Sequence, residues 1–292
     1  MRIFMVVVLI SSLLVGCEPM DTTDSEILID IGEHKLQMRP TGKGAPVVVF
    51  EAGIADPMDR LFAFHDRIAR ETRVISYNRA GYGASEAGPL PRSAVREAEE
   101  LKLLLDRASV PPPYVLVGHS LGAFVVQMFA ANYPDDVSGI VLLDPPPLAF
   151  ALGKEFTDLA AMAEQMTAEW AAHAEELADS PNDMEKRQST FFAMITSEHR
   201  EMFGESARSV DSIATFGDLP LVVIASGIPN PAFGQVAEEF QTFWANQSRA
   251  LSRKSSQGKF IWAKESSHYI YEDAPDLVTG TILDMVRHQR DK

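Results

Sequence analysis

The sequence contains only one cysteine, Cys17, so a disulfide bond within one molecule is excluded. It also lacks the patterns that mark metal and dinucleotide sites: it has no H-E-x-x-H, no pair of cysteines and no G-x-G-x-x-G that opens a helix. Positive charge is scarce: the chain has 26 lysines and arginines but 41 acidic residues, and its net charge is −15. Such an acidic surface repels phosphate backbones. We therefore expect no metal ion, no cofactor and no nucleic-acid partner.

The rest of the composition is typical of a globular protein. Hydrophobic residues make up 46 % of the 292 residues and charged residues 23 %, which argues against a disordered or collagen-like chain. This length allows one large α/β domain or two ordinary ones. No repeat is visible, and the acidic charge by itself indicates solubility.

The first residues have the composition of an export signal. Arg2 precedes a short apolar run, residues 3–15, and a positive start before such a run is typical of a secretory signal peptide. The run is shorter than the roughly 20 apolar residues that a transmembrane helix needs. We therefore expect residues 1–16 to direct export rather than to form part of the fold.

Leu14-Val15-Gly16-Cys17 resembles the lipobox, the cleavage site of bacterial lipoprotein signal peptides. The resemblance implies that Cys17 becomes a lipid-modified N-terminus, and that the polar residues 17–26 tether the domain to a membrane. Glu18, rather than aspartate, after the cysteine implies the outer membrane. The prediction is an exported cell-envelope lipoprotein. An ordinary signal peptide with an incidental cysteine, or an uncleaved anchor, is the alternative.

Short apolar runs alternate with helical patterns through most of the chain. After an early hairpin at about 27–40, continuously apolar runs predict strands at 46–50, 73–77, 114–118, 139–144, 219–226 and 259–263. The stretches between them predict helices at about 57–70, 94–108, 123–133, 232–250 and 275–289. Apolar strands separated by helices indicate a mostly parallel sheet covered by helices on both faces.

The alternation stops between about 148 and 215. This stretch has no strand pattern, and methionine and aromatic residues recur in it at helical spacing. Such residues usually pack inside a core. Together they also fit an apolar roof over the carboxyl edge of the sheet, where ligands bind in open α/β folds. We expect a core of residues 27–147 and 216–292, with a helical cap at 148–215.

Gly118-His119-Ser120-Leu121-Gly122 matches the pattern G-x-S-x-G. The match follows an apolar strand and opens a helix, which is the structural context of a nucleophile elbow. The glycines let backbone segments approach closely at a sharp turn, which lifts the Ser120 hydroxyl to the sheet edge beside a helix N-terminus. Ser120 is therefore the candidate nucleophile, and a plain strand–turn–helix junction is the alternative.

Four segments resemble α/β-hydrolases of the esterase and peroxidase-like group. They read VVVFEAGIADP, SYNRAGYGASEAGPLPR, PYVLVGHSLGAFVVQMFAANYPDDVSGIVLLDPPP and SSHYIYEDAPDLV, and they span most of residues 46–147 and 266–278. The resemblance implies the α/β-hydrolase fold: a mostly parallel central sheet flanked by helices, with a helical cap inserted. Serine at the elbow argues against the haloalkane dehalogenase and epoxide hydrolase relatives, which carry aspartate there.

The resemblance also implies an oxyanion hole made by the backbone N–H groups of Ile54 and Leu121. Gly53-Ile54 takes the place of the family's His-Gly-x loop, with Ala52 where the histidine usually stands. Because backbone donors bind the oxyanion, the missing histidine is not needed for this role. Residues 78–85 resemble the family's Asp-Arg-x-Gly-x-Gly-x-Ser loop, and we interpret this loop as structural.

A serine hydroxyl needs a base, and histidine, with an ordinary pKa of about 6.5, suits that role. Among the seven histidines, His268 alone follows the last expected strand and precedes the last expected helix. In this fold the triad runs in the order serine, acid, histidine. We therefore expect His268 to be the general base of Ser120.

The sequence offers more than one acid for the triad. The family's usual position follows strand 219–226, where this chain has Asn230 instead of an aspartate. Asp144 ends the preceding strand at the same edge of the sheet, and we favour it as the acid. Glu238 or Glu239 is the second option, and a triad without an acid is the third.

These residues predict a serine hydrolase that cleaves small carboxylic esters through an acyl-enzyme intermediate on Ser120. An apolar cap suits acyl or aryl substrates of modest size. An amidase, aminopeptidase or acyltransferase with the same nucleophile is the second hypothesis. The third is a non-catalytic, ligand-binding envelope lipoprotein with a decayed triad, which Asn230 supports.

Overall fold

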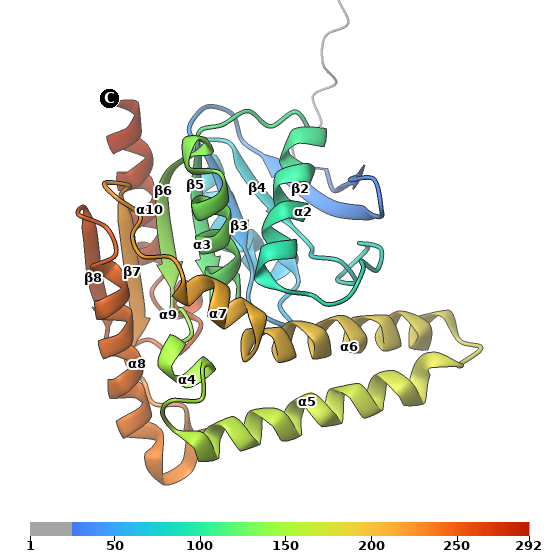
Figure 1. Ribbon diagram of the computed structural model, residues 1–292. Helices are drawn as coiled ribbons and strands as arrows, with labels where there is room; N and C mark the ends of the chain where they lie inside the picture. The colour runs from blue at the N-terminus through green and yellow to red at the C-terminus, as the bar shows by residue number, and fades with distance from the viewer. Residues whose placement is uncertain (1–24, 292) are drawn as a thin grey trace, which may run out of the picture.

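The computed structural model describes residues 25–291, which form one β-sheet with helices on its two faces (Figure 1). The expected signal peptide, Cys17 and the tether as far as residue 24 lie outside the described residues, so export and lipidation stay predictions. Within the described part of the chain, none of the helices combines the length and the apolar composition needed to cross a bilayer.

The sheet has eight strands in the order β1-β2-β4-β3-β5-β6-β7-β8. Their bounds are β1 Ile27–Asp30, β2 Lys35–Thr41, β3 Val47–Glu51, β4 Val74–Tyr77, β5 Tyr114–His119, β6 Val137–Leu143, β7 Leu221–Ser226 and β8 Gly258–Ala263. Only the β1–β2 and β2–β4 pairings are antiparallel, and all other pairings are parallel. The expected α/β-hydrolase fold with a mostly parallel sheet is confirmed.

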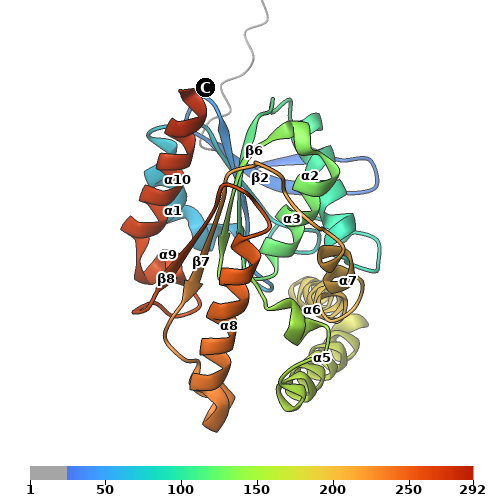
Figure 2. The same cartoon turned by 60° about the vertical axis from the view of Figure 1, so that its left-hand side comes forward.

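The central strands are apolar throughout because helices cover both of their faces. Every residue of β3 and of β5 is buried. Val48 packs on one face with α1 and α10, whereas Val49 packs on the other with α2, α3 and α7. Figure 2 shows α1 and α10 together on one side of the sheet and α2 and α3 on the other. A strand buried on both faces loses the polar–apolar alternation, and this is why it appears as a continuous apolar run.

Among residues 25–291, six helices surround the sheet, and short 3₁₀ turns join some of them to the strands. The helices are α1 Phe62–Ala69, α2 Ala94–Arg107, α3 Gly122–Asn132, α8 Ala237–Ser252, α9 Ile270–Asp273 and α10 Pro275–Arg290. The 3₁₀ turns are η1 Met58–Leu61, η2 Pro134–Asp136 and η3 Pro231–Val236. The last turn accounts for a difference from the expected helix at 232–250, because α8 starts only after Gly234 has broken the helical backbone.

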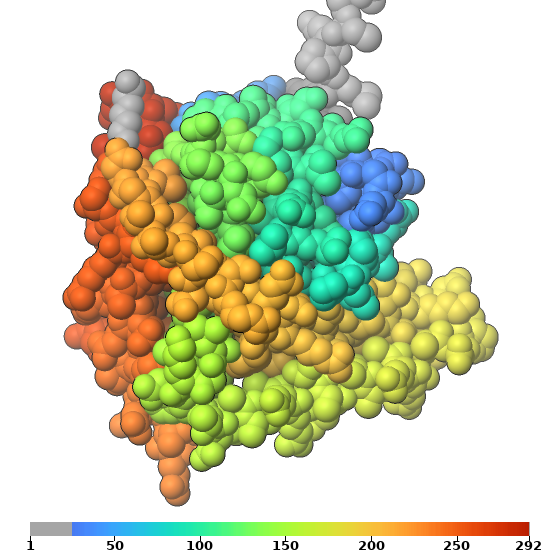
Figure 3. Space-filling view, viewed as in Figure 1, coloured from blue at the N-terminus to red at the C-terminus, as the bar shows by residue number. Residues whose placement is uncertain are grey.

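Four further helices lie between β6 and β7 in the chain. They are α4 Leu148–Ala151, α5 Thr157–Ala178, α6 Asp183–Met202 and α7 Glu205–Asp211. Helices α5 and α6 pack on each other as a long hairpin that extends beyond the body of the molecule (Figures 1 and 3). Helix α7 packs on α2 and α3.

The methionines of the hairpin do not form the continuous apolar roof that their spacing suggested. Met162, Met166 and Met184 are exposed. Helix α5 buries only a narrow seam, at Leu159, Thr167 and Ala174, because its main packing partner is α6. The apolar cover near the site is instead an aromatic cluster around Phe240, to which Phe150 and Phe156 belong.

Candidate active site

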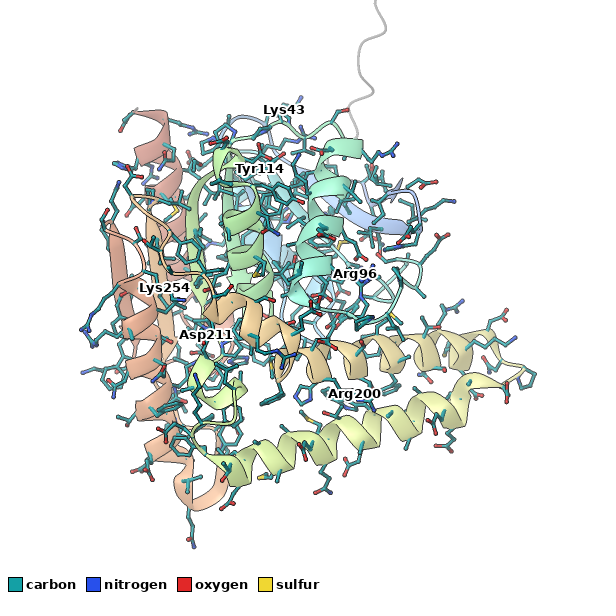
Figure 4. The ribbon with its side chains drawn as sticks, in the orientation of Figure 1. Lys43, Arg96, Tyr114, Arg200, Asp211 and Lys254 are labelled. Carbon is teal, nitrogen blue, oxygen red and sulfur yellow. The ribbon has the colours of Figure 1, made fainter. Side chains whose placement is uncertain are left out.

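Ser120 occupies a strained turn between β5 and α3. Strand β5 starts at Tyr114, at the end of the sheet away from α6, and ends on the side of the cap helices (Figure 4). The φ angle of Ser120 is +50°, a conformation that non-glycine residues adopt rarely and mostly at functional sites. A Cβ atom at Gly122 would lie 2.4 Å from the carbonyl oxygen of Glu51. The glycine therefore lets α3 start directly against β3.

Two backbone amides beside Ser120 have no hydrogen-bond partner within residues 25–291. They belong to Ile54 and to Leu121, the residue that precedes α3. A Cβ placed on Gly53 would lie 3.3 Å from the Ser120 Cβ, so the loop that carries Ile54 is adjacent to the serine. Free N–H groups near a helix N-terminus bind a developing negative charge. These two amides are therefore the candidate donors of an oxyanion hole.

His268 lies in the loop after β8 and contacts Asp144, which directly follows β6. The His268 Nδ1 and Asp144 Oδ2 atoms are 2.6 Å apart. The Asp144 side chain is buried, whereas the His268 side chain is 35 % exposed. When a carboxylate accepts from Nδ1–H, Nε2 is left free to take a proton. Among the described residues no hydrogen bond joins Ser120 to His268, and this contact often tightens only when substrate binds.

Ser226, the last residue of β7, fixes the Asp144 carboxylate. Its backbone N–H donates to Asp144 Oδ1 and its hydroxyl donates to Oδ2, both at 2.8 Å. The Gln241 side chain in turn donates to the Ser226 carbonyl oxygen at 2.8 Å. Sequence reasoning missed Ser226. The sequence did contain one hint: the strand predicted at 219–226 ends in a serine, and the strand predicted before it ends in Asp144.

The other candidate acids lie elsewhere. Glu238 and Glu239 are exposed in the first turn of α8 and border an open depression beside Phe156. Asn230 caps η3, where its side-chain oxygen accepts from the N–H of Ala232 at 3.0 Å. Of the three acidic side chains that the sequence offered, the structure brings only Asp144 to His268.

His119 is a second residue that sequence reasoning missed. It is buried, its ring centroid lies 4.6 Å from that of His268, and its Nε2 lies 3.0 Å from the His268 carbonyl oxygen. Burial lowers the pKa of His119, so its ring is neutral at neutral pH. A neutral ring with Nε2–H can donate to the His268 carbonyl and thereby hold the loop that carries the base.

A buried ionic cluster lies beside the site. Four carboxyl groups share two guanidinium groups, and all six side chains are buried: Glu51, Glu97, Glu100, Glu198, Arg79 and Arg92. The loop from Asn78 to Ser85, interpreted as structural from the sequence, supplies Arg79. Because acids outnumber bases, the cluster cannot hold all of its carboxyl groups ionised without an unbalanced buried charge.

Glu97 is the acid that keeps its proton most readily. Burial, and then repulsion from Glu198, raise the pKa of Glu97 well above its usual range. Its Oε1 atom lies 3.7 Å from Arg92 Nε and 3.8 Å from Arg79 Nε, and neither distance is a hydrogen bond. A neutral carboxylic acid at this position leaves the two guanidinium groups for the remaining three carboxylates.

We expect Glu97→Gln to stabilise the protein relative to wild type at pH 8 and to change its stability little near pH 4.5. The unfolded chain loses the Glu97 proton above about pH 4.5, whereas the folded protein keeps it. The folded wild type therefore loses stability as pH rises from that value towards the raised pKa, and glutamine removes this slope. Urea unfolding at pH 5 and pH 8 measures the effect. The exposed Glu99→Gln is the control, and an equal gain at both pH values would contradict a retained proton.

Within residues 25–291, no group of three or more histidine, cysteine, aspartate or glutamate side chains is arranged to hold a metal ion.

The chain resembles known proteins over most of its length. Residues 48–281 match the model of the alpha/beta hydrolase family. The uncharacterized protein YqjL of Bacillus subtilis is 31 % identical over 247 residues, which are 84 % of this chain and 85 % of that protein.

Two solved structures show the same fold. The first is a mutant of a Pseudomonas aeruginosa protein provisionally named an epoxide hydrolase, with a TM-score of 0.69, 18 % identity, and coverage of 94 % of this chain and 99 % of the other. The second is an esterase from Thermogutta terrifontis, with a TM-score of 0.62, 21 % identity, and coverage of 90 % and 98 %. At these identities the likeness concerns the fold alone.

Proposed function

The chain belongs to the alpha/beta hydrolase family, and on that premise we propose that it hydrolyses small carboxylic esters through an acyl-enzyme intermediate on Ser120. The observation that carries the proposal is the 2.6 Å contact between His268 Nδ1 and the buried Asp144 carboxylate. This contact lies at the sheet edge where the elbow presents Ser120. The esterase from Thermogutta terrifontis, which shares the fold, is consistent with this chemistry.

In the proposed first step, Ser120 Oγ attacks the ester carbonyl carbon while His268 Nε2 takes the hydroxyl proton. The carbonyl oxygen becomes an oxyanion, which accepts hydrogen bonds from the Ile54 and Leu121 N–H groups. The C–O bond to the alcohol then breaks, and the alcohol leaves with the proton from His268. Asp144 stabilises the imidazolium that exists between these events.

In the proposed second step, water attacks the acyl-enzyme and His268 takes one of its protons. The second tetrahedral intermediate collapses, Ser120 recovers its proton from His268, and the carboxylic acid leaves. Both steps use the same two backbone donors, so the oxyanion hole acts twice in each turnover. The His268 side chain is 35 % exposed, and its ring centroid lies 6.0 Å from that of Trp244, which packs on Phe240.

Intact mass measured after incubation with a fluorophosphonate tests the proposal. An activated serine should gain one phosphonyl group, and peptide mapping should locate it on Ser120. Heat-unfolded protein is the control, because activation requires the folded triad. A folded protein that gains no adduct at pH 8 would contradict the proposal and favour a ligand-binding role.

The same preparation separates ester from amide chemistry. We expect p-nitrophenyl butyrate to be cleaved much faster than the matched p-nitroanilide, because the alcohol leaves without the full protonation that an amine needs. Equal rates of ester and anilide cleavage would indicate an amidase instead. Transfer of the acyl group to an added alcohol faster than to water would move it to an acyltransferase.

A further inference from the structure

Glu198 links the cap to the loop that carries the candidate oxyanion donor. It belongs to α6, yet its side chain is fully buried against the core. Its two carboxylate oxygens accept from Arg79 Nε at 3.0 Å and from Arg79 Nη2 at 2.9 Å. The Tyr82 hydroxyl donates to the same carboxylate at 2.5 Å. A bidentate contact of this kind fixes the plane of the guanidinium group.

Arg79 and Tyr82 in turn hold the backbone from Ala52 to Ala55. Arg79 donates to the carbonyl oxygen of Ala52 at 2.7 Å and to that of Gly53 at 2.9 Å. The Tyr82 hydroxyl accepts from the N–H of Ala55 at 3.0 Å. Both side chains that contact Glu198 thus also contact the loop that contains Ile54.

The contact with the Gly53 carbonyl matters because of peptide geometry. The Gly53 carbonyl and the Ile54 N–H belong to one planar trans peptide unit, so they point in opposite directions. When Arg79 fixes the carbonyl, it also fixes the direction of the Ile54 N–H. A positively charged donor on the carbonyl oxygen further polarises the unit and makes its N–H a stronger donor.

We propose that Glu198 is a positioning residue for the oxyanion hole: it orients Arg79 and Tyr82 so that the Ile54 N–H faces the developing oxyanion. The inference rests on the proposed function and deepens it. It also makes the strength of the oxyanion hole depend on how α6 is docked, since Glu198 is the contribution of the cap to this network.

Among the described residues, Glu51 is the other carboxylate that accepts a hydrogen bond from Arg79, and Glu97 approaches Arg79 Nε only to 3.8 Å. Glu51 pairs with Arg79 Nη1 at 2.8 Å, so the guanidinium charge keeps one partner when Glu198 is changed. Arg79 Nη2, however, donates to both Gly53 and Glu198. Without the carboxylate the guanidinium group keeps its contacts with Glu51 and with the backbone carbonyls, but it loses the bidentate contact that fixes its plane and therefore holds the Gly53 peptide less firmly. The fold of the core should survive this change, because Glu51 and Arg79 remain paired.

Helix α6 is docked closely enough for this role. The Phe191 ring packs edge-on against Tyr82 with centroids 5.1 Å apart. A Cβ at Gly81 would lie 2.4 Å from the Met194 side chain, so α6 lies directly on this loop. Figure 1 shows α6 crossing beneath the sheet at the end where β5 gives way to α3. Glu198 is therefore held in place by contacts that do not involve its own charge.

The test compares Glu198→Gln and Glu198→Ala with the exposed cap variant Glu175→Gln in the full chain. With p-nitrophenyl butyrate, kcat of both Glu198 variants should fall by about 10- to 100-fold, the alanine variant more, while KM changes by less than about threefold. The inhibition constant of a trifluoromethyl ketone, whose adduct carries an oxyanion, should rise in parallel. The pH dependence of kcat/KM should keep its midpoint, because His268 and Asp144 are untouched.

The outcomes separate the inference from the function on which it rests. Unchanged kcat and ketone inhibition in a folded Glu198 variant, beside an active wild type, would overturn the inference alone. A wild type that neither reacts with fluorophosphonate nor cleaves the ester would overturn the proposed function. If both Glu198 variants fail to fold, Tyr82→Phe decides: it removes the acceptor of the Ala55 N–H without removing charge, and kcat equal to that of wild type would overturn the inference.

Discussion

Ser120→Ala is expected to lower kcat/KM for p-nitrophenyl butyrate by about 10⁴- to 10⁶-fold, the range found when a member of a catalytic triad is removed. Alanine removes the only hydroxyl at the elbow and leaves the backbone unchanged, because both residues face a similar cost at φ of +50°. The residual rate should come from binding and from the Ile54 and Leu121 amides alone. Steady-state kinetics measure the loss, and circular dichroism checks the fold.

Ser256→Ala is a matched control for this variant. Ser256 is an exposed serine on the loop before β8, at the opposite edge of the sheet from Ser120. We expect it to retain full activity and full reaction with the fluorophosphonate. If Ser120→Ala kept more than about one tenth of the wild-type kcat/KM, another group would be the nucleophile and the triad assignment would be wrong.

The sheet was predictable because its signal is local. A strand buried on both faces needs only a continuous apolar run to be recognised, and β5, β6 and β7 lie within one or two residues of their expected bounds. The elbow was predictable for a similar reason, since its glycines act within five residues of Ser120. The order of β3 and β4 in the sheet is not local, and no pattern in the sequence indicated it.

The choice of acid shows where local reasoning ends. His119 of β5 pairs with Leu143 of β6, so the next residues, Ser120 and Asp144, leave neighbouring strands at the same level. This pairing register brings Asp144 to the site, whereas Glu238 and Glu239 lie on the first turn of an exposed helix. Spacing along the chain does not show the register, so the sequence favoured Asp144 without excluding the two glutamates.

Contacts between distant segments account for the residues that the sequence did not reveal. Ser226 reaches Asp144 across 82 residues, His119 reaches the His268 carbonyl across 149, and Glu198 reaches Arg79 across 119. Each of these side chains is buried and polar. A buried polar group needs a hydrogen-bond partner, but this rule does not say which residue the partner is. Only the fold shows that.

Asp144→Asn should cost nearly as much activity as the loss of Ser120. An asparagine amide that donates towards His268 Nδ1 holds the ring in the tautomer that carries its proton on Nε2, where it cannot accept the Ser120 proton. The change keeps the shape of the side chain, and the Ser226 N–H still has an oxygen acceptor at Oδ1. We expect kcat/KM for p-nitrophenyl butyrate at pH 7 to fall by about 10⁴-fold.

Glu238→Gln and Glu239→Gln make the same chemical change at the two rejected acids, and both should retain wild-type kcat/KM. The contrast is sharp because the Asp144 side chain is buried against His268, whereas the two glutamates face solvent. The rate of fluorophosphonate labelling should follow the same order, since it also requires His268 to take the Ser120 proton. A large loss in either glutamate variant, with Asp144→Asn active, would assign the acid to α8. It would also require the His268 loop to move away from the end of β6 when substrate binds.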